Sequence, residues 1–470
     1  MNALINGKKV IKNEKMDIIN PYTNEIIDQV PVCVREDVKI AIDAAVKAQK
    51  KLEAWSAFKV SNALYNAYEN LKKSKNEIAS LLMAETGKPI KDSLFEMERS
   101  VETLKLAAEE AKRIYGESIP MDAGLGGKGF LAFTQKIPLG VVAAITPFNY
   151  PVNLAIHKLA PAIACKNAVI LKPSSKAPLS AMKMAKIIAN EFPPGIVNTL
   201  TGSGSEIGDE LTINPKIAKI SFTGSVTTGI MISNRAGMKK LTLELGGNDP
   251  LLVLKDADIE KAVQGAVNGS YLYSGQVCMA VKRIIVDNQI ADDFIELFKK
   301  VTEKLKVGDP SLMDTDIGPL IDENAAVAVE KSVENGIKNG ATLVYGGKSN
   351  GNFFEPTILD NVDSSMDVVV NETFGPVSPI IRVNDVEEAI KVANHSKYAL
   401  QAGVFTENLK EGLKCVNEIE AGTVFLNKQS TFRTDNMPFG GFKSSGVGKE
   451  GIKYAVEDMS RSKLIAINLR

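Results

Sequence analysis

Between residues 140 and 245 the chain alternates short apolar segments with helical ones, and this alternation constrains the fold more than any other feature. Five buried strands are expected, with helical segments between them: 141–146, 168–172, 196–200, 217–222 and 240–245. Strands that alternate with helices in this way form a parallel, doubly wound α/β sheet. Such a sheet binds ligands at the carboxyl ends of its strands, and it is the usual platform for a dinucleotide.

The regions on either side predict further structure. Residues 37–116 have the apolar spacing of amphipathic helices. The glycine-rich stretch 117–137 predicts a protruding hairpin or edge ribbon. A second α/β region is expected beyond it, with strands at 250–254, 284–286, 379–381, 403–405 and 422–426. A chain of 470 residues is too long for one ordinary core, so several domains are expected.

Composition excludes several classes of function. Lys plus Arg and Asp plus Glu number 56 each, so no net charge attracts nucleic acid or an anionic membrane. No apolar run reaches the length of a membrane span, and the N-terminus lacks the layout of a signal peptide. The four cysteines form no CxxC pair, which argues against a disulfide framework or a structural zinc site. We therefore expect a reduced, cytoplasmic protein with no metal and no nucleic-acid or membrane partner.

Two short segments carry the clearest chemistry. Cys278 ends a small polar loop, Ser274-Gly-Gln-Val-Cys278, and Glu244 precedes the pair Gly246-Gly247 at the end of an expected strand. A nucleophilic thiol and a general-base carboxylate are the groups needed to form and then hydrolyse a thioester. The chain has only two histidines, which makes a Cys-His hydrolase a weak alternative.

Asn149 is a candidate for a third role. It lies between Pro147 and Pro151, directly after an expected strand. An asparagine here is explained equally by simple turn chemistry. The functional alternative is a rigidly placed amide that, with the backbone N–H of Cys278, stabilises an oxyanion.

Several loops at strand ends are candidates for a cofactor site. The segments 202–208 and 224–229 are rich in glycine, and each follows an expected strand and opens a helix, as pyrophosphate-binding loops do. Neither is GxGxxG, so ordinary turns remain an alternative. Lys172 ends another strand and either binds a ribose or 2′-phosphate or is solvated. Glu372 could bind ribose hydroxyls while Phe374 packs beside a nicotinamide.

Together these segments resemble the aldehyde dehydrogenase superfamily over essentially the whole chain. Seven motifs occur in the family's order: Pro147-Phe-Asn-Tyr-Pro151, Lys172-Pro-Ser174, Phe222-Thr-Gly-Ser225, Glu244-Leu-Gly-Gly247, Gly275-Gln-Val-Cys278, Glu372-Thr-Phe-Gly-Pro376 and Pro438-Phe-Gly-Gly-Phe-Lys443-Ser-Ser-Gly446. Any one of them is only suggestive, but all of them in order leave little room for another family.

The resemblance implies a three-part subunit. A Rossmann-like nucleotide-binding domain would comprise 1–116 and 139–246, and an α/β catalytic domain 247–441. A small β oligomerisation arm, 117–138 with 455–470, would form homodimers or homotetramers. NAD or NADP is implied as the cofactor, with no metal. The implied contacts to it are Thr146, Pro147, Phe148, Lys172, Ser174, Ser175, Gly204, Gly208, Phe222, Thr223, Gly224, Ser225, Leu245, Gly246, Glu372 and Phe374.

The resemblance also implies roles for the catalytic residues. Cys278 would attack the aldehyde carbon, Asn149 would stabilise the oxyanion, and Glu244 would activate the water that hydrolyses the thioester. CoA-acylating relatives generally lack this glutamate, so that alternative ranks low. A thiol esterase without redox chemistry and a non-catalytic protein that kept the fold are further alternatives.

Two positions bear on specificity. The sequence is most similar to lactaldehyde dehydrogenases of methanogens, which make lactate for coenzyme F420, and to non-phosphorylating glyceraldehyde-3-phosphate dehydrogenases. The latter carry an arginine where this chain has Val277, so lactaldehyde is the favoured substrate and glyceraldehyde-3-phosphate the alternative, although Arg99 or Arg433 could still reach the pocket. Many NAD-preferring members have a glutamate at the position of Ser175, so NADP should be tolerated.

Overall fold

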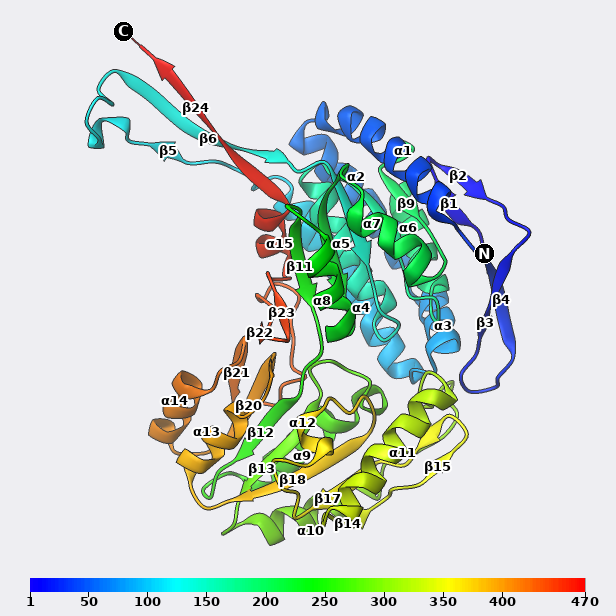
Figure 1. The fold of residues 1–470 in the computed structure, drawn as a ribbon, viewed down its shortest axis with the longest axis vertical. Coiled ribbons are helices and arrows are strands. Elements are labelled where there is room, and N and C mark those ends of the chain that lie inside the picture. The colour runs from blue at the N-terminus through cyan, green and yellow to red at the C-terminus, as the bar shows by residue number, and fades with distance from the viewer. Residues whose placement is uncertain (470) are drawn as a thin grey trace.

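Two separate β-sheets organise the chain, and a long ribbon projects from the side of the first (Figure 1). The computed structural model describes residues 1–469. No helix in this range is long and apolar enough to cross a membrane.

The first sheet has eight strands and contains the predicted parallel core. Its order is β2 (Lys8–Val10), β1 (Ala3–Ile5), β9 (Val197–Thr199), β8 (Ala168–Lys172), β7 (Val141–Ile145), β10 (Ile217–Thr223), β11 (Lys240–Glu244) and β23 (Gly446–Val447). The five central strands from β9 to β11 pair in parallel, and β1 and β23 join antiparallel at the two sides. All five strands predicted between 140 and 245 are therefore confirmed. Every residue of β7 and β8 is buried, as expected for a sheet covered on both faces.

Helices cover this sheet. Those between its strands are α5 (Pro151–Ala164), α6 (Leu179–Ala189), the π-turn η2 (Gly204–Gly208), α7 (Asp209–Ile213) and α8 (Val226–Arg235). The predicted helical region forms α1 (Arg35–Glu53), α2 (Ala57–Lys73), α3 (Lys75–Thr86) and α4 (Ile90–Glu110). α4 packs against α5, and α15 (Ile452–Asp458), from the end of the chain, packs against both. A hairpin of β3 (Lys15–Ile19) and β4 (Ile26–Pro31) precedes these helices.

The second sheet has seven strands. Its order is β14 (Thr342–Tyr345), β17 (Thr357–Asp360), β18 (Val377–Val383), β13 (Val281–Asp287), β12 (Asp249–Val253), β20 (Gln401–Phe405) and β21 (Thr423–Leu426). Only β14 is antiparallel. The five strands predicted beyond residue 250 are confirmed, whereas β14 and β17 were not predicted.

The second sheet has its own helices and short strands. Its helices are α9 (Ile259–Tyr271), η3 (Leu272–Gly275), α10 (Ala291–Thr302), α11 (Glu323–Lys338), α12 (Asp367–Val370), α13 (Val386–Asn394) and α14 (Leu409–Glu418). The short strands form two pairs, β15 (Ser349–Asn350) with β16 (Phe353–Phe354), and β19 (Tyr398–Ala399) with β22 (Phe442–Lys443).

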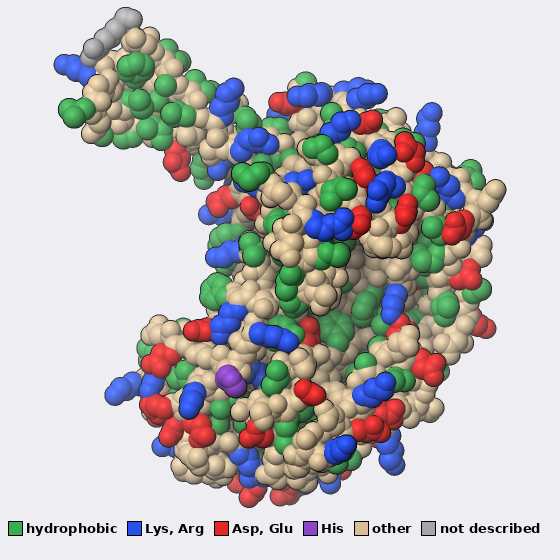
Figure 2. All heavy atoms as spheres, viewed as in Figure 1, with side chains coloured by type: hydrophobic (Ala, Val, Ile, Leu, Met, Phe, Trp, Pro, Cys, Tyr) green, Lys and Arg blue, Asp and Glu red, His purple; other side chains and the backbone are tan. Residues whose placement is uncertain are grey.

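The projecting ribbon consists of β5 (Ser118–Ile119), β6 (Phe130–Pro138) and β24 (Ser460–Asn468), with the 3₁₀ turn η1 (Met121–Ala123) between the first two. β24 pairs antiparallel with β6 along its whole length. Figure 2 shows hydrophobic side chains gathered on this ribbon, away from the body of the subunit. Leu464 is 55% exposed and Ile467 43% exposed. A thin ribbon cannot bury both of its faces by itself, so it leaves apolar surface for another chain to cover.

Candidate active site

The three predicted catalytic residues come from segments that follow or precede strands of the two sheets. Asn149 lies between β7 and α5, Glu244 ends β11, and Cys278 lies in the loop before β13. The side-chain amide of Asn149 donates a hydrogen bond to the carbonyl oxygen of Gln276 over 2.8 Å. Since Gln276 is two residues before Cys278, this bond fixes the asparagine against the cysteine loop. One amide N–H is used in this way, and the second is left for a ligand.

The loop before Cys278 has an unusual backbone that its neighbours hold in place. Tyr273, Ser274 and Gly275 have φ values of 47°, 54° and 70°, all in the left-handed region. A Cβ on Gly275 would lie 2.1 Å from the carbonyl oxygen of Gly375, so glycine is required there. The hydroxyls of Tyr273 and Ser274 donate to the carbonyls of Thr86 and Gly318, each over 2.8 Å. These bonds stabilise a conformation that would otherwise be strained.

The Cys278 thiol is half-buried, and its environment keeps it protonated. Burial raises the pKa of the thiol to about 12, and the charge of Glu372 adds to the effect while Lys282 opposes it. Without a ligand, therefore, very little thiolate is present at neutral pH.

Glu244 is a buried carboxyl group with no hydrogen-bond partner. It is 2% exposed, and neither oxygen has a partner among the described residues. Burial raises the pKa of Glu244 well above its usual value, and the charge of Glu450 adds to this, while Lys158 and Arg433 oppose it. A carboxyl group that is desolvated and unpartnered is suited to proton transfer near neutral pH.

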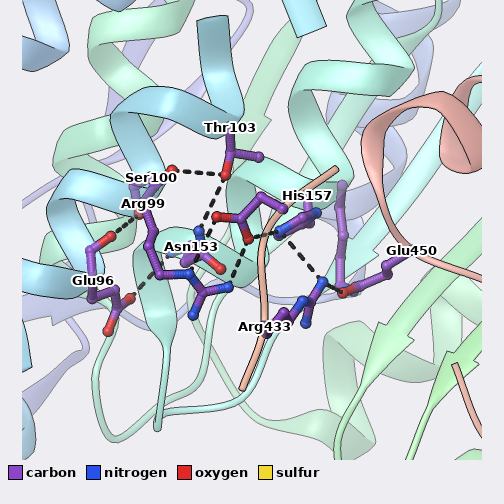
Figure 3. Close-up of polar contacts among 10 residues, drawn as sticks. Glu96, Arg99, Ser100, Thr103, Asn153, His157, Arg433 and Glu450 are labelled. Carbon is purple, nitrogen blue, oxygen red and sulfur yellow. Dashed lines mark hydrogen bonds and ion pairs between the residues drawn. The ribbon is translucent and has the colours of Figure 1, made fainter. Parts of the chain in front are cut away.

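Near Glu244 lies a buried cluster of three charged side chains, Lys158, Glu450 and Arg433, whose pairing the sequence did not reveal. The ammonium of Lys158 donates to Thr223 Oγ1 and to Glu450 Oε1, each over 2.7 Å. Arg433 Nη2 donates to the other oxygen of Glu450 over 3.2 Å (Figure 3). Burial opposes ionisation of Glu450, but the charges of Lys158 and Arg433 outweigh it and lower its pKa to about 2. The only signal in the sequence was the pair His157-Lys158 inside the otherwise apolar helix 151–164.

A cavity of about 460 Å³ reaches the cysteine region from the side of α4. Its lining includes Arg99, Tyr150, Leu272, Met279 and Arg433. Tyr150 and Leu272 belong to the same apolar cluster as Cys278. Both arginines that the sequence suggested therefore reach the pocket. Each is already paired, however, because Arg99 binds Asp435 and Arg433 binds Glu450.

A second cavity, of about 620 Å³, has the features of a cofactor site. Phe148, Glu372 and Phe374 line it, with α11 on the opposite wall. The rings of Phe148 and Phe374 meet edge to face, with centroids 6.0 Å apart. Glu372 Oε1 accepts hydrogen bonds from the backbone N–H of Gly247 over 3.3 Å and from the Lys282 ammonium over 3.0 Å. A Cβ on Gly246 would lie 2.1 Å from the Glu372 carboxylate, so this glycine allows the close approach.

The loops predicted to bind the pyrophosphate and adenosine parts of a dinucleotide lie at the carboxyl ends of the strands of the first sheet. The two glycine-rich segments do open helical turns, η2 and α8, which Ser203 and Ser225 cap with their hydroxyls. Added Cβ atoms on Gly204 and Gly208 would meet nothing within 4 Å, so these glycines border open space. Leu245 is different, since it packs against Gly229 of α8.

Lys172 is the strongest indication of an anionic or hydroxyl-bearing ligand. It ends β8 and is 8% exposed, and its ammonium has no hydrogen bond or ion pair among the described residues. Burial lowers its pKa to about 8. A buried ammonium without a partner is unfavourable, and a ribose or phosphate would relieve it. The residues present thus fit a nicotinamide dinucleotide.

Comparisons with known proteins agree with this geometry. The sequence model of the aldehyde dehydrogenase family matches residues 10–465. A lactaldehyde dehydrogenase of Methanocaldococcus jannaschii is 47% identical over 98% of this chain and 99% of its own. A 3-sulfolactaldehyde dehydrogenase of Priestia megaterium is 42% identical over 99% of this chain and 97% of its own.

Solved structures give the same result. A glyceraldehyde-3-phosphate dehydrogenase of Methanocaldococcus jannaschii, complexed with NADP, has a TM-score of 0.94 and 47% identity, covering 97% of this chain and 100% of that one. An NADP-dependent glyceraldehyde-3-phosphate dehydrogenase of Bacillus halodurans, also complexed with NADP, has a TM-score of 0.98 and 40% identity, covering 100% and 99%. The family resemblance and the α/β fold predicted from the sequence are confirmed.

Proposed function

The chain belongs to the aldehyde dehydrogenase family and is an NAD(P)-dependent enzyme, and we propose that it oxidises a short, uncharged hydroxyaldehyde, with lactaldehyde converted to lactate. The observation that carries this choice is the pairing of Arg99. Its guanidinium makes two hydrogen bonds to Asp435, of 3.2 and 2.6 Å. A cation that is already bound bidentately to a carboxylate has little to offer a phosphate.

The position before the catalytic thiol supports the same choice. Val277 is 1% exposed and packs in the apolar cluster around Cys278. A phosphorylated aldehyde would have to bring its charge into a cavity whose lining cations Lys91, Arg99 and Arg433 are already paired with carboxylates. Among the described residues, the lining cation without a carboxylate partner is the exposed Lys428, whose ammonium lies over the Phe432 ring. Burial of an uncompensated charge costs several kcal/mol, on the order of the binding energy of a small substrate.

The proposed reaction begins at Cys278. The thiol gives up its proton to water, and the sulfur attacks the aldehyde carbon to form a thiohemiacetal, whose oxyanion accepts hydrogen bonds from the Asn149 amide and the Cys278 backbone N–H. When bound, NAD(P) supplies the hydride acceptor. Glu244 then takes a proton from the water that attacks the resulting thioester, which releases the carboxylic acid and the free thiol. The positive charges of Lys158 and Arg433 favour the ionised form that Glu244 needs for this step.

The cofactor would be held by residues that line the second cavity and by residues at the carboxyl edge of the first sheet. Glu372 would bind ribose hydroxyls, and Phe148 and Phe374 would flank the nicotinamide end. Lys172, Ser174 and Ser175 would face the adenosine ribose, where the absence of a carboxylate at Ser175 leaves room for a 2′-phosphate. We propose that NADP is accepted as a cofactor and that NAD is not excluded.

One observation favours glyceraldehyde-3-phosphate as a second candidate. Arg433 lines the aldehyde cavity, and its Nε is buried without a hydrogen-bond partner. Its carboxylate partner, Glu450, is also bound by Lys158, so the charge of Arg433 is less completely neutralised than that of Arg99. A phosphate at this arginine would place the enzyme in central carbon metabolism, whereas lactaldehyde oxidation fits lactate supply for coenzyme F420 in the cytoplasm.

The β5–β6–β24 ribbon is proposed to join subunits into homodimers or homotetramers. The apolar side chains exposed on β6 and β24 would be covered in such an assembly, which is the usual reason for a patch of this kind.

The test of the proposed substrate is a parallel measurement of kcat/KM with lactaldehyde and with glyceraldehyde-3-phosphate, each with NAD and with NADP. The proposal predicts a clear preference for lactaldehyde and activity with NADP. A higher kcat/KM and low KM for the phosphorylated aldehyde would refute it, and activity with NAD but none with NADP would refute the cofactor assignment.

A further inference from the structure

We propose that Asp435 is a specificity-determining residue, which neutralises Arg99 and thereby makes the aldehyde cavity select uncharged substrates over phosphorylated or sulfonated ones. The identity of the favoured uncharged substrate rests on the proposed function, but the effect of Asp435 on anionic substrates does not. Nothing in the sequence motifs points to this residue.

The geometry places Asp435 behind Arg99 as seen from the cavity. Arg99, from α4, lines the cavity, while Asp435 contacts it from the protein side and does not line the cavity itself. The two side chains are 12% and 6% exposed. On its other side, Asp435 Oδ1 lies 2.8 Å from Nε2 of the buried His157. The carboxylate is therefore held rigidly between an imidazole and a guanidinium.

Arg99 and Asp435 together contribute no net charge to the wall of the aldehyde cavity. Burial opposes ionisation of Asp435, but the hydrogen bond from His157 and the charge of Arg99 lower the pKa of the carboxyl well below its usual value. Burial, with the charge of Arg433, lowers the pKa of His157, which leaves the imidazole neutral at physiological pH. Arg99 and Asp435 thus cancel, and His157 adds no charge.

Loss of the Asp435 charge would change what Arg99 can bind. Asparagine has nearly the same shape and can still hydrogen-bond His157 and Arg99, but it carries no charge. The guanidinium would then be a buried, uncompensated cation on the cavity wall, and a substrate anion would be its best available partner. The same contacts allow an alternative role for Asp435, in which it orients Arg99 toward a substrate anion. In that case, loss of Asp435 would weaken anion binding.

The chain offers a matched control for the loss of such a pair. Arg382 Nε and Nη2 bind Asp360 Oδ1 and Oδ2 over 3.1 and 2.9 Å, a bidentate arrangement like that of Arg99 with Asp435. Unlike Arg99, Arg382 also donates from Nη2 to a second carboxylate, Asp292 Oδ1, over 2.8 Å. Asp360 lies in β17 of the second sheet and lines neither the aldehyde cavity nor the cofactor cavity. Asp360→Asn therefore removes a carboxylate from a comparable pair without changing the charge of the aldehyde site.

The experiment measures kcat/KM for glyceraldehyde-3-phosphate and for lactaldehyde, at saturating NADP, in wild type, Asp435→Asn and Asp360→Asn. In Asp435→Asn we expect the ratio of phosphorylated to uncharged substrate to rise about 10-fold to 30-fold, the effect of one charge at short range in a partly desolvated site. Asp360→Asn should leave the ratio unchanged. 3-Phosphoglycerate should also become a stronger inhibitor than lactate, competitive with aldehyde, in Asp435→Asn alone.

A fall in the ratio, or no change, in folded Asp435→Asn would overturn the proposal. The direction of the change is independent of the wild-type preference, so a wild type that prefers glyceraldehyde-3-phosphate refutes the proposed substrate without deciding the role of Asp435. The double variant Arg99→Gln/Asp435→Asn must abolish the gain, because the gain is assigned to Arg99. If Asp435→Asn does not fold, Asp435→Ser removes the same charge with a smaller side chain and is subject to the same criteria.

Discussion

The stability of Glu244→Gln relative to wild type should increase as the pH rises, because the Glu244 carboxyl group is buried without a hydrogen-bond partner. Its pKa is raised in the folded state by burial and by Glu450, whereas the unfolded chain ionises it near its ordinary value. A group with a raised folded pKa contributes stability that is fully present below the unfolded pKa and is lost as the pH rises toward the folded pKa. Glutamine does not titrate, so the variant lacks this loss.

The magnitude follows from proton linkage. While the folded state holds one proton that the unfolded state has lost, each pH unit costs about 1.4 kcal/mol. Between about pH 5.5 and about pH 7.5 the wild type should therefore lose at most about 3 kcal/mol relative to Glu244→Gln. For a chain of this length, that corresponds to a relative change in Tm of about 3 °C.

The assay is thermal unfolding of both proteins at the two pH values, at one protein concentration and scan rate. Glu296→Gln, on α10, is the control, because the hydrogen bond from Lys300 lowers the pKa of Glu296 and Glu296 does not contribute to the pKa shift of Glu244. Its contribution to stability is lost only as the pH falls below the ordinary range of a carboxyl group. Its Tm offset from wild type should be the same at both pH values. An equally constant offset for Glu244→Gln would show that Glu244 is ionised in the folded protein and would refute the reasoning.

Three further predictions concern the thiol, the cofactor and the ribbon. Alkylation of Cys278 by iodoacetamide, without nucleotide and with Cys278→Ser as the blank, should keep accelerating from about pH 7 to about pH 10, since burial raises its pKa to about 12; a plateau near neutral pH would contradict this. Ser175→Glu should lower the ratio of kcat/KM with NADP to that with NAD by about tenfold or more, through repulsion of the 2′-phosphate, and an unchanged ratio would remove Ser175 from the site. If subunits associate through the ribbon as proposed, Leu464→Asp, at a position 55% exposed on β24, should sediment as a smaller species than wild type, whereas an unchanged mass would exclude the ribbon as the interface.

The sequence predicts the central parallel strands well where they are fully buried and form nearly continuous apolar runs. β7 and β8 are examples, with every residue buried. β14 was missed because it is an edge strand with no buried residue and gives a weak signal. β17 is buried but only four residues long, and it is flanked by Pro356 and Asn361, which resemble turn residues.

The site shows a similar division. Cys278, Glu244 and Asn149 could be predicted as catalytic residues because each occupies a local segment with distinctive neighbours, and their roles stay predictions. The partners of these segments could not be found in that way: Arg99 and Asp435 are 336 residues apart, and Lys158 and Glu450 are 292 apart. Only the fold brings such charges together, and their pairing decides whether an arginine in the pocket is free to bind an anion. The sequence could name Arg99 and Arg433 but not the carboxylates that neutralise them.

The most direct test of the central claim is to identify the covalent intermediate on Glu244→Gln after a brief reaction with lactaldehyde and NADP. Mass spectrometry of the intact protein and of its peptides should find one lactoyl group per subunit, held as a thioester on Cys278 and absent from Cys278→Ser. One equivalent of NADPH should form rapidly with it, followed by little turnover. Full steady-state turnover by Glu244→Gln, or an acyl group on any other residue, would contradict the account.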